Sequence, residues 1–113
     1  RWGRALFTGK AMTAPYLDRL LDSVPQGKDR TDRRYGTGVA IHAATPYGPV
    51  YGHAGWIPGY VSSLRHYADF GITVAFQINS VVSMFGEHTD LVPELEAALA
   101  ELALGARNAP RRP

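Results

Sequence analysis

The segment from Gly48 to Ser63 carries the residues whose types and spacing are best suited to chemistry. Its glycines and prolines crowd a stretch that otherwise has the pattern of a β-strand and its exit, whereas core strands avoid both residue types. Close approach of a ligand or of another backbone explains such crowding. Gly52 and Gly55 clear space around the polar ring of His53, and the backbone N–H of Trp56 is the kind of donor that holds an oxyanion during acyl transfer. The segment therefore predicts one side of a pocket in which a carbonyl group is attacked.

The same residues carry a family resemblance. The sequence resembles the C-terminal segment of the serine beta-lactamase and penicillin-binding-protein-like hydrolases, and in particular the branch of class C type enzymes, D-alanyl-D-alanine carboxypeptidases and esterases. The matching residues are His53-Ala54-Gly55, then Trp56-Ile57-Pro58-Gly59-Tyr60, then Ile72-Thr73-Val74-Ala75-Phe76-Gln77-Ile78-Asn79. In that family a third motif, composed of Lys or His, then Thr or Ser, then Gly, lies on a sheet-edge strand beside the nucleophilic serine. The resemblance covers nearly the whole chain, from the first helix to the last.

The resemblance implies a role for each matched residue. His53 stands at the Lys or His position and the Trp56 N–H is the second oxyanion donor, so these two are the predicted catalytic residues. Ala54 at the hydroxyl position, Gly55 at the glycine and Tyr60 on the pocket floor are the residues predicted to bind substrate. The implied reaction transfers an acyl group to water through a serine ester. Its partner is a small-molecule acyl substrate: an ester, an amide or a lactam.

Two of the family's three motifs are missing from this sequence. None of the five serines (Ser23, Ser62, Ser63, Ser80 and Ser83) begins a Ser-x-x-Lys motif, and no Tyr or Ser is followed two residues later by Asn. An acyl-enzyme needs an activated serine and a base, so this chain alone is not expected to turn over substrate. We expect a C-terminal fragment whose missing N-terminal portion carries the nucleophile. Because Ala54 lacks the hydroxyl that commonly holds a substrate carboxylate, neutral esters and amides are favoured.

Each of these residues also has a purely structural interpretation. His53 can be an ordinary strand histidine, and Trp56 and Tyr60 can be packing aromatics. Gly55 and Gly59 can serve turn geometry alone. The alternative function is accordingly a noncatalytic binding or assembly module that keeps the sheet without the chemistry.

Composition and spacing argue against several other classes. The 113-residue, 12.3 kDa chain has no cysteine and a net charge of only +2. The four histidines (His42, His53, His66 and His88) match no short metal-ligand motif, so we expect neither metal nor cofactor. Asp29 and Asp32 interrupt the cluster of Arg30, Arg33 and Arg34, so no nucleic-acid partner is expected. No apolar run approaches the roughly 20 residues of a membrane span.

The elements that position these residues follow from periodicity. Apolar residues at helical spacing predict a helix over about 14–23, and a stripe of Leu91, Leu95, Ala98, Leu99 and Leu102 predicts a helix that Gly105 ends. Residues 28–34 have the character of a solvated loop. Alternation predicts strands over 35–43, 50–55, 60–67 and 72–79, with a break at 56–59 and a tight connection at 68–71.

These elements predict an α+β fold, an antiparallel sheet meander flanked by helices, which the resemblance implies is the C-terminal part of a beta-lactamase-like fold. Residues 1–106 are predicted to be the C-terminal portion of one such domain. Residues 107–113 carry three Arg and two Pro without an apolar anchor, so we predict a disordered basic tail.

Overall fold

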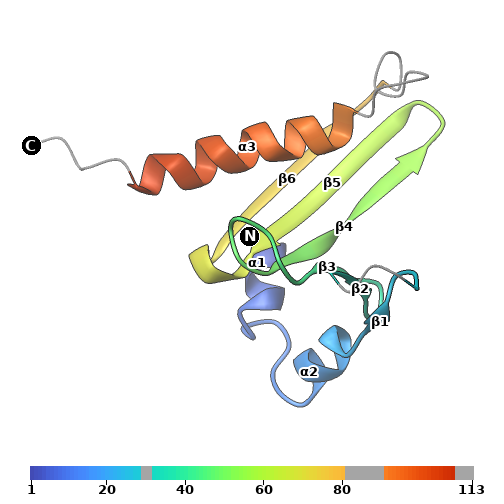
Figure 1. Cartoon of the computed structure of the whole chain (residues 1–113), viewed down its shortest axis with the longest axis vertical. Helices are drawn as coiled ribbons and strands as arrows, with labels where there is room; N and C mark the ends of the chain where they lie inside the picture. Colours follow the sequence, from blue (N-terminus) through green and yellow to red (C-terminus); the bar gives the residue numbers. More distant parts are fainter. Residues whose placement is uncertain (29–31, 81–90, 109–113) are drawn as a thin grey trace, which may run out of the picture. The chain divides into compact units, whose positions relative to one another are not determined.

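The computed structural model describes residues 1–28, 32–80 and 91–108. Their elements are α1 (Trp2–Phe7), α2 (Tyr16–Leu21), β1 (Val24–Pro25), β2 (Arg33–Tyr35), β3 (Ala40–His42), β4 (Val50–Ile57), β5 (Tyr60–Tyr67), the short 3-10 helix η1 (Ala68–Phe70), β6 (Ile72–Ile78) and α3 (Leu91–Asn108) (Figure 1). The strands form one six-stranded sheet in the order β1-β2-β3-β4-β5-β6, so each strand lies beside its neighbours in sequence. The predicted α+β meander is confirmed.

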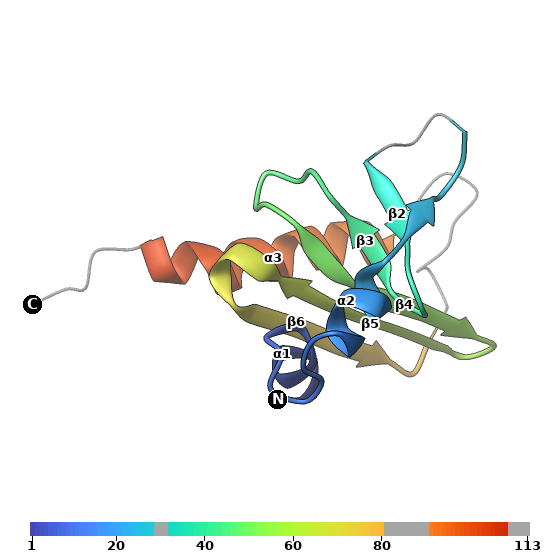
Figure 2. The same ribbon diagram turned by 90° about the horizontal axis from the view of Figure 1, so that it is seen from below.

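The described residues divide into two compact units, of which unit 1 comprises Arg1–His53 and Leu64–Thr73. In unit 1, α1 packs against β5 and β6 (Figure 2). A Cβ atom at Gly3 would lie 2.9 Å from a methyl carbon of Thr73 and 3.2 Å from one of Leu64, so only glycine allows the helix to come this close. The ring of Phe7 stacks on His66 at a centroid distance of 5.4 Å. These contacts anchor α1 on the sheet.

Unit 2 comprises the described residues of Ala54–Ser63 and Val74–Pro113. Its helix, α3, is tied to β5 by a 2.5 Å hydrogen bond in which Ser63 Oγ donates to Glu96 Oε1. The buried residues of α3 are Val92, Ala100 and Leu104. The predicted stripe was therefore wrong in part, because Ala98 and Leu102 are exposed. Ala100 is 1% exposed, so α3 buries a different face from the one that carries the leucine stripe.

Two predicted boundaries of the helices were also wrong. α3 continues through Gly105 to Asn108, because a helical glycine costs only about 1 kcal/mol and does not break the hydrogen-bond pattern. Arg107 and Asn108 are thus helical, while residues 109–113 of the predicted tail lie outside the described residues. The helix predicted over 14–23 is the shorter α2, Tyr16–Leu21.

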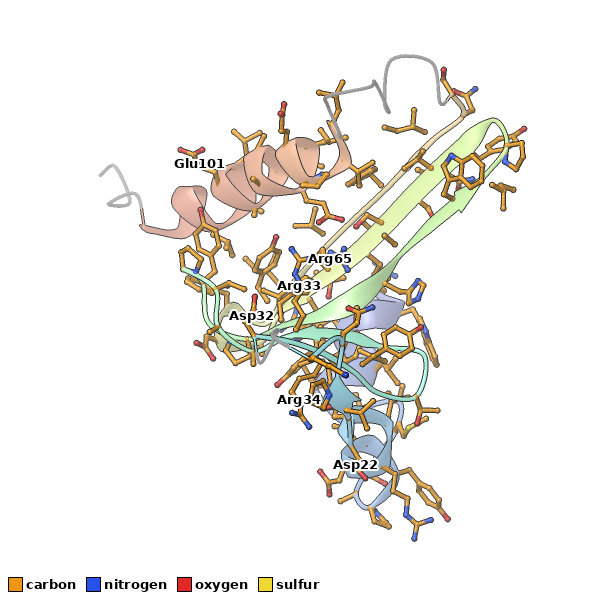
Figure 3. All side chains as sticks on the ribbon, turned by 45° about the vertical axis from the view of Figure 1, so that its right-hand side comes forward. Asp22, Asp32, Arg33, Arg34, Arg65 and Glu101 are labelled. Carbon is orange, nitrogen blue, oxygen red and sulfur yellow. The ribbon has the colours of Figure 1, made fainter. Side chains whose placement is uncertain are left out.

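The strand predicted over 35–43 is two strands, β2 and β3, which pair antiparallel with Tyr35 opposite Ala40. Gly38 turns the chain with a φ of +72°, and the Gly36 N–H donates to the Val39 carbonyl at 2.8 Å. The alternation of apolar residues continues through this turn, so the sequence pattern does not show that the chain reverses direction here. β2 also begins inside the predicted loop over 28–34. Its Arg34, labelled in Figure 3, donates through Nε to Ser23 Oγ at 3.0 Å and through Nη2 to the Ser23 carbonyl.

The hairpins on either side of β5 follow the prediction more closely. β4 runs to Ile57, so Trp56 and Ile57 belong to the strand and the predicted break shrinks to Pro58 and Gly59, where Gly59 has a φ of +88°. η1 and Gly71, with a φ of +60°, make the tight connection predicted before β6. Among the described residues, no helix combines the length and apolarity needed to cross a bilayer.

Candidate active site

The predicted third motif lies on the part of β4 that extends past its neighbour β3. The register pairs His42 with Val50, Ile41 with Tyr51 and Ala40 with Gly52. β3 begins only at Ala40, because the Gly38 turn precedes it, whereas β4 continues to Ile57. The residues 53–57 therefore follow the end of the β3 register. An edge of this kind leaves backbone N–H groups able to face a ligand.

Gly52 fixes the backbone immediately before His53. A Cβ atom at Gly52 would lie 1.9 Å from the Leu64 carbonyl oxygen and 3.2 Å from Arg65 Cα. The β5 backbone therefore occupies the space that any side chain at Gly52 would need. The glycine was predicted to clear space for a ligand, and in the structure the space it leaves is taken by another backbone, the other reason considered for glycine in a strand.

His53 is exposed and makes a specific polar contact. Its Nε2 lies 2.8 Å from the hydroxyl oxygen of Tyr35, and the two rings meet edge to face with centroids 5.8 Å apart. His53 also lines a hollow of about 170 Å³ with Trp2, Leu6 and Phe7 of α1 among the other lining residues. The imidazole is thus accessible beside a cavity, as the pocket hypothesis requires.

Gly55, Trp56 and Tyr60 come together in unit 2. They line a hollow of about 220 Å³, here called the Trp56 hollow, whose lining among the described residues is Gly55, Trp56, Ile57, Tyr60, Val61, Ser62 and Gln77. Trp56 is 58% exposed and Tyr60 47% exposed, so neither ring is packed in a core. None of these seven described residues carries a charge. The hollow therefore suits a neutral, largely apolar group.

Gly55 lies close to the Ser62 side chain. A Cβ atom at this position would lie 2.7 Å from Ser62 Oγ, closer than ordinary contact. Ala54, the remaining predicted substrate-binding residue, is exposed on β4 between His53 and Gly55.

The described histidines, His42, His53 and His66, do not gather into a metal centre. His66 is 1% exposed, its Nδ1 lies 2.8 Å from Thr73 Oγ1, and burial first, then the positive charge of Arg4, lower its pKa from the usual value of 6.5. His42 lies on β3, and His88 is outside the described residues. Within the described part of the chain, no three metal-ligating side chains gather.

Sequence reasoning missed Tyr35, Ser62 and Gln77. Tyr35 is 18 residues from His53, and no local spacing indicates the contact, since it depends on the register of β2, β3 and β4. Ser62 and Gln77 lie on β5 and β6, and alternation along these strands predicts their faces but not the hollow that they share.

The comparisons with known proteins agree with this architecture. No protein-family model matches the chain, and no curated protein matches it. The structure is similar to a solved structure of a D-stereospecific amidohydrolase from Streptomyces sp., with a TM-score of 0.62 and 26% sequence identity. The match covers 68% of this chain and 23% of that chain, so the chain spans less than a quarter of the amidohydrolase's length. The chain therefore has the fold of the beta-lactamase and penicillin-binding-protein-like superfamily, in which this amidohydrolase is found.

Proposed function

We propose that the chain supplies the third-motif strand and the oxyanion side of an active site that hydrolyses amides or esters through a serine ester. The nucleophilic serine comes from residues outside this sequence, because none of its serines lies in a Ser-x-x-Lys motif. The serine hydroxyl attacks the carbonyl carbon, the amine or alcohol leaves with a proton, and water then cleaves the ester. Similarity to the amidohydrolase supports this proposal at the level of the superfamily.

The observation that carries the proposal is the state of His53. A structural histidine on a strand is ordinarily buried and satisfied, whereas this imidazole is exposed, bonded on one side to Tyr35, and lines a hollow. It also lies at the start of the part of β4 that extends beyond the pairing with β3. His53 would polarise or orient groups near the nucleophile, and the Trp56 N–H, three residues along the same strand, would stabilise the oxyanion.

Neutral substrates fit the site best. Ala54 offers no hydroxyl to a carboxylate, and the Trp56 hollow is lined by uncharged residues. The amidohydrolase is D-stereospecific, which makes neutral amides and esters of D-amino acids, paired with their L-forms, the first compounds to test. The branch of class C type enzymes, carboxypeptidases and esterases remains a prediction within this proposal.

The test is a kinetic comparison in a gene product that contains both this chain and a Ser-x-x-Lys segment. We expect His53→Ala to lower kcat by about 10²-fold or more, the range typical of removing a group that acts in the transition state, with the fold intact by circular dichroism. His42→Gln, a change on the neighbouring strand β3, is the matched control and should retain activity. Unchanged kinetics in the His53 variant would reject the catalytic role.

A noncatalytic binding or assembly module is the second candidate. It is favoured by the exposed apolar side chains of Trp56, Ile57 and Tyr60, which are 58%, 61% and 47% exposed. A fluorophosphonate probe separates the two functions, because it labels an activated serine covalently. Labelling of the gene product that contains this chain supports the hydrolase, and absence of labelling together with saturable binding of an apolar ligand supports the module.

A further inference from the structure

Tyr35 and His53 form a polar pair that the third motif does not account for. The hydroxyl oxygen of Tyr35 lies 2.8 Å from His53 Nε2, and the rings cross at 70°. Both residues belong to unit 1, and Tyr35 is half-buried on β2, two strands away from the strand that carries His53.

The sheet register brings the part of β2 that carries Tyr35 within one residue of His53 on β4. Tyr35 is opposite Ala40 on β3, and Ala40 is opposite Gly52 on β4. Tyr35, Ala40 and Gly52 thus lie in one row across three strands, and the contact is made with the residue that follows Gly52 on β4. That residue is His53. The backbone of Tyr35 is itself held on both sides, since it also pairs with Val24 of β1.

The direction of the hydrogen bond follows from the chemistry of the two groups. A phenol is the more acidic donor, and the unprotonated nitrogen of a neutral imidazole is the stronger acceptor. The Tyr35 hydroxyl therefore donates to Nε2, which places the ring proton of neutral His53 on Nδ1. Nδ1 makes no hydrogen bond to another of the described residues.

We propose that Tyr35 is a positioning residue that holds neutral His53 in its Nδ1–H form, with Nδ1–H as the group presented to a substrate oxygen. This inference rests on the proposed function for its catalytic meaning, whereas the tautomer itself is a property of the chain. The hydroxyl bond fixes both the orientation of the ring and the atom that can donate. A histidine held this way polarises a carbonyl or an oxyanion from a defined direction.

The test is ¹⁵N NMR of the chain labelled at histidine, recorded at increasing pH until the His53 signals no longer change. The imidazole signals are assigned to His53 by their loss in His53→Gln. We expect Nδ1 to carry the proton in the unsubstituted chain, and Tyr35→Phe to shift the population toward Nε2–H. Tyr47→Phe, which removes another half-buried hydroxyl in unit 1, is the matched control and should leave the His53 signals unchanged.

The outcomes separate this inference from the proposed function. An Nε2–H form in the unsubstituted chain overturns the inference without any variant, and so does an unchanged tautomer in a folded Tyr35→Phe chain. In the gene product with the nucleophile, Tyr35→Phe should lower kcat about tenfold or more with little change in KM, because misplacing a reacting group slows chemistry rather than binding. If the tautomer responds but His53→Ala leaves the kinetics unchanged, the positioning stands and the proposed function fails.

Discussion

Replacing Gly52 by alanine tests the packing that fixes the strand before His53. The added methyl carbon would lie 1.9 Å from the Leu64 carbonyl oxygen and 2.9 Å from its carbonyl carbon. Ordinary contact begins at 3.4 Å, so the β5 backbone must retreat by about 1.5 Å at this point. The obstructing atoms are backbone, and no side-chain rotation can relieve the clash.

The expected cost follows from the spacing of the sheet. Strands lie about 4.8 Å apart and are joined by hydrogen bonds of about 2.9 Å, so a retreat of this size breaks those nearest the clash. Each backbone hydrogen bond has a net value of roughly 0.5–1.5 kcal/mol, and overpacking adds strain. We therefore expect the Gly52→Ala substitution to lower the free energy of unfolding by about 2–4 kcal/mol. For a domain of this size that corresponds to a fall in melting temperature of roughly 10 °C or more.

Thermal and urea unfolding followed by circular dichroism measure this cost. Gly105→Ala is the matched control, because it makes the same chemical change in α3, where nothing lies within 4 Å of the added carbon. That variant should gain about 0.5–1 kcal/mol from helix propensity. Opposite signs for the two substitutions are the expected result. A Gly52→Ala chain that melts at the parent temperature would refute the close approach of β5.

Two further predictions concern buried polar groups. Because burial, and then the charge of Arg4, lower the pKa of His66 from 6.5, the unfolded chain binds a proton below about pH 6.5 that the folded chain does not. The free energy of unfolding should therefore fall as the pH drops below about 6.5, by up to about 1.4 kcal/mol per pH unit, and should level off below the pKa of His66 in the folded chain. Urea unfolding at several pH values should show that His66→Gln removes this pH dependence. Ser63→Ala, which removes the hydroxyl that donates to Glu96, should lower the free energy of unfolding by about 1.5–3 kcal/mol. The neighbouring Ser62→Ala is the control and should lower it by about 0.5 kcal/mol or less. Equal losses in the two variants would contradict a stabilising bond between β5 and α3.

Local patterns predicted the part of the fold in which sequence neighbours are also spatial neighbours. The strand 60–67, the connection at Gly71 and β6 required only alternation and a glycine able to adopt positive φ. The reversal at Gly38 was missed because apolar residues alternate on both sides of the turn and within it. The face of α3 was missed because two helical stripes compete: the leucine stripe is the more apolar, but the buried one, at Val92, Ala100 and Leu104, is selected by packing and by the Ser63–Glu96 bond.

The candidate site divides in the same way. His53, Gly55 and Trp56 could be proposed from the sequence because they adjoin one another in a recognisable motif. Tyr35 was not predicted, because its contact with His53 depends on two strand registers that no local pattern gives. Gly52 was recognised as unusual for a strand, but only the structure shows that the neighbouring backbone, rather than a ligand, fills the space.

Because β4 is longer than β3, substitutions in the two parts of β4 are expected to have different effects. From Val50 to Gly52, each β4 residue is paired with a residue of β3, so substitutions there are expected to change the stability of the fold. From Ala54 to Ile57 the side chains are exposed, and three of the four line the Trp56 hollow. Substitutions from Ala54 to Ile57 therefore change exposed positions, but at Gly55 an added carbon would also lie 2.7 Å from Ser62 Oγ.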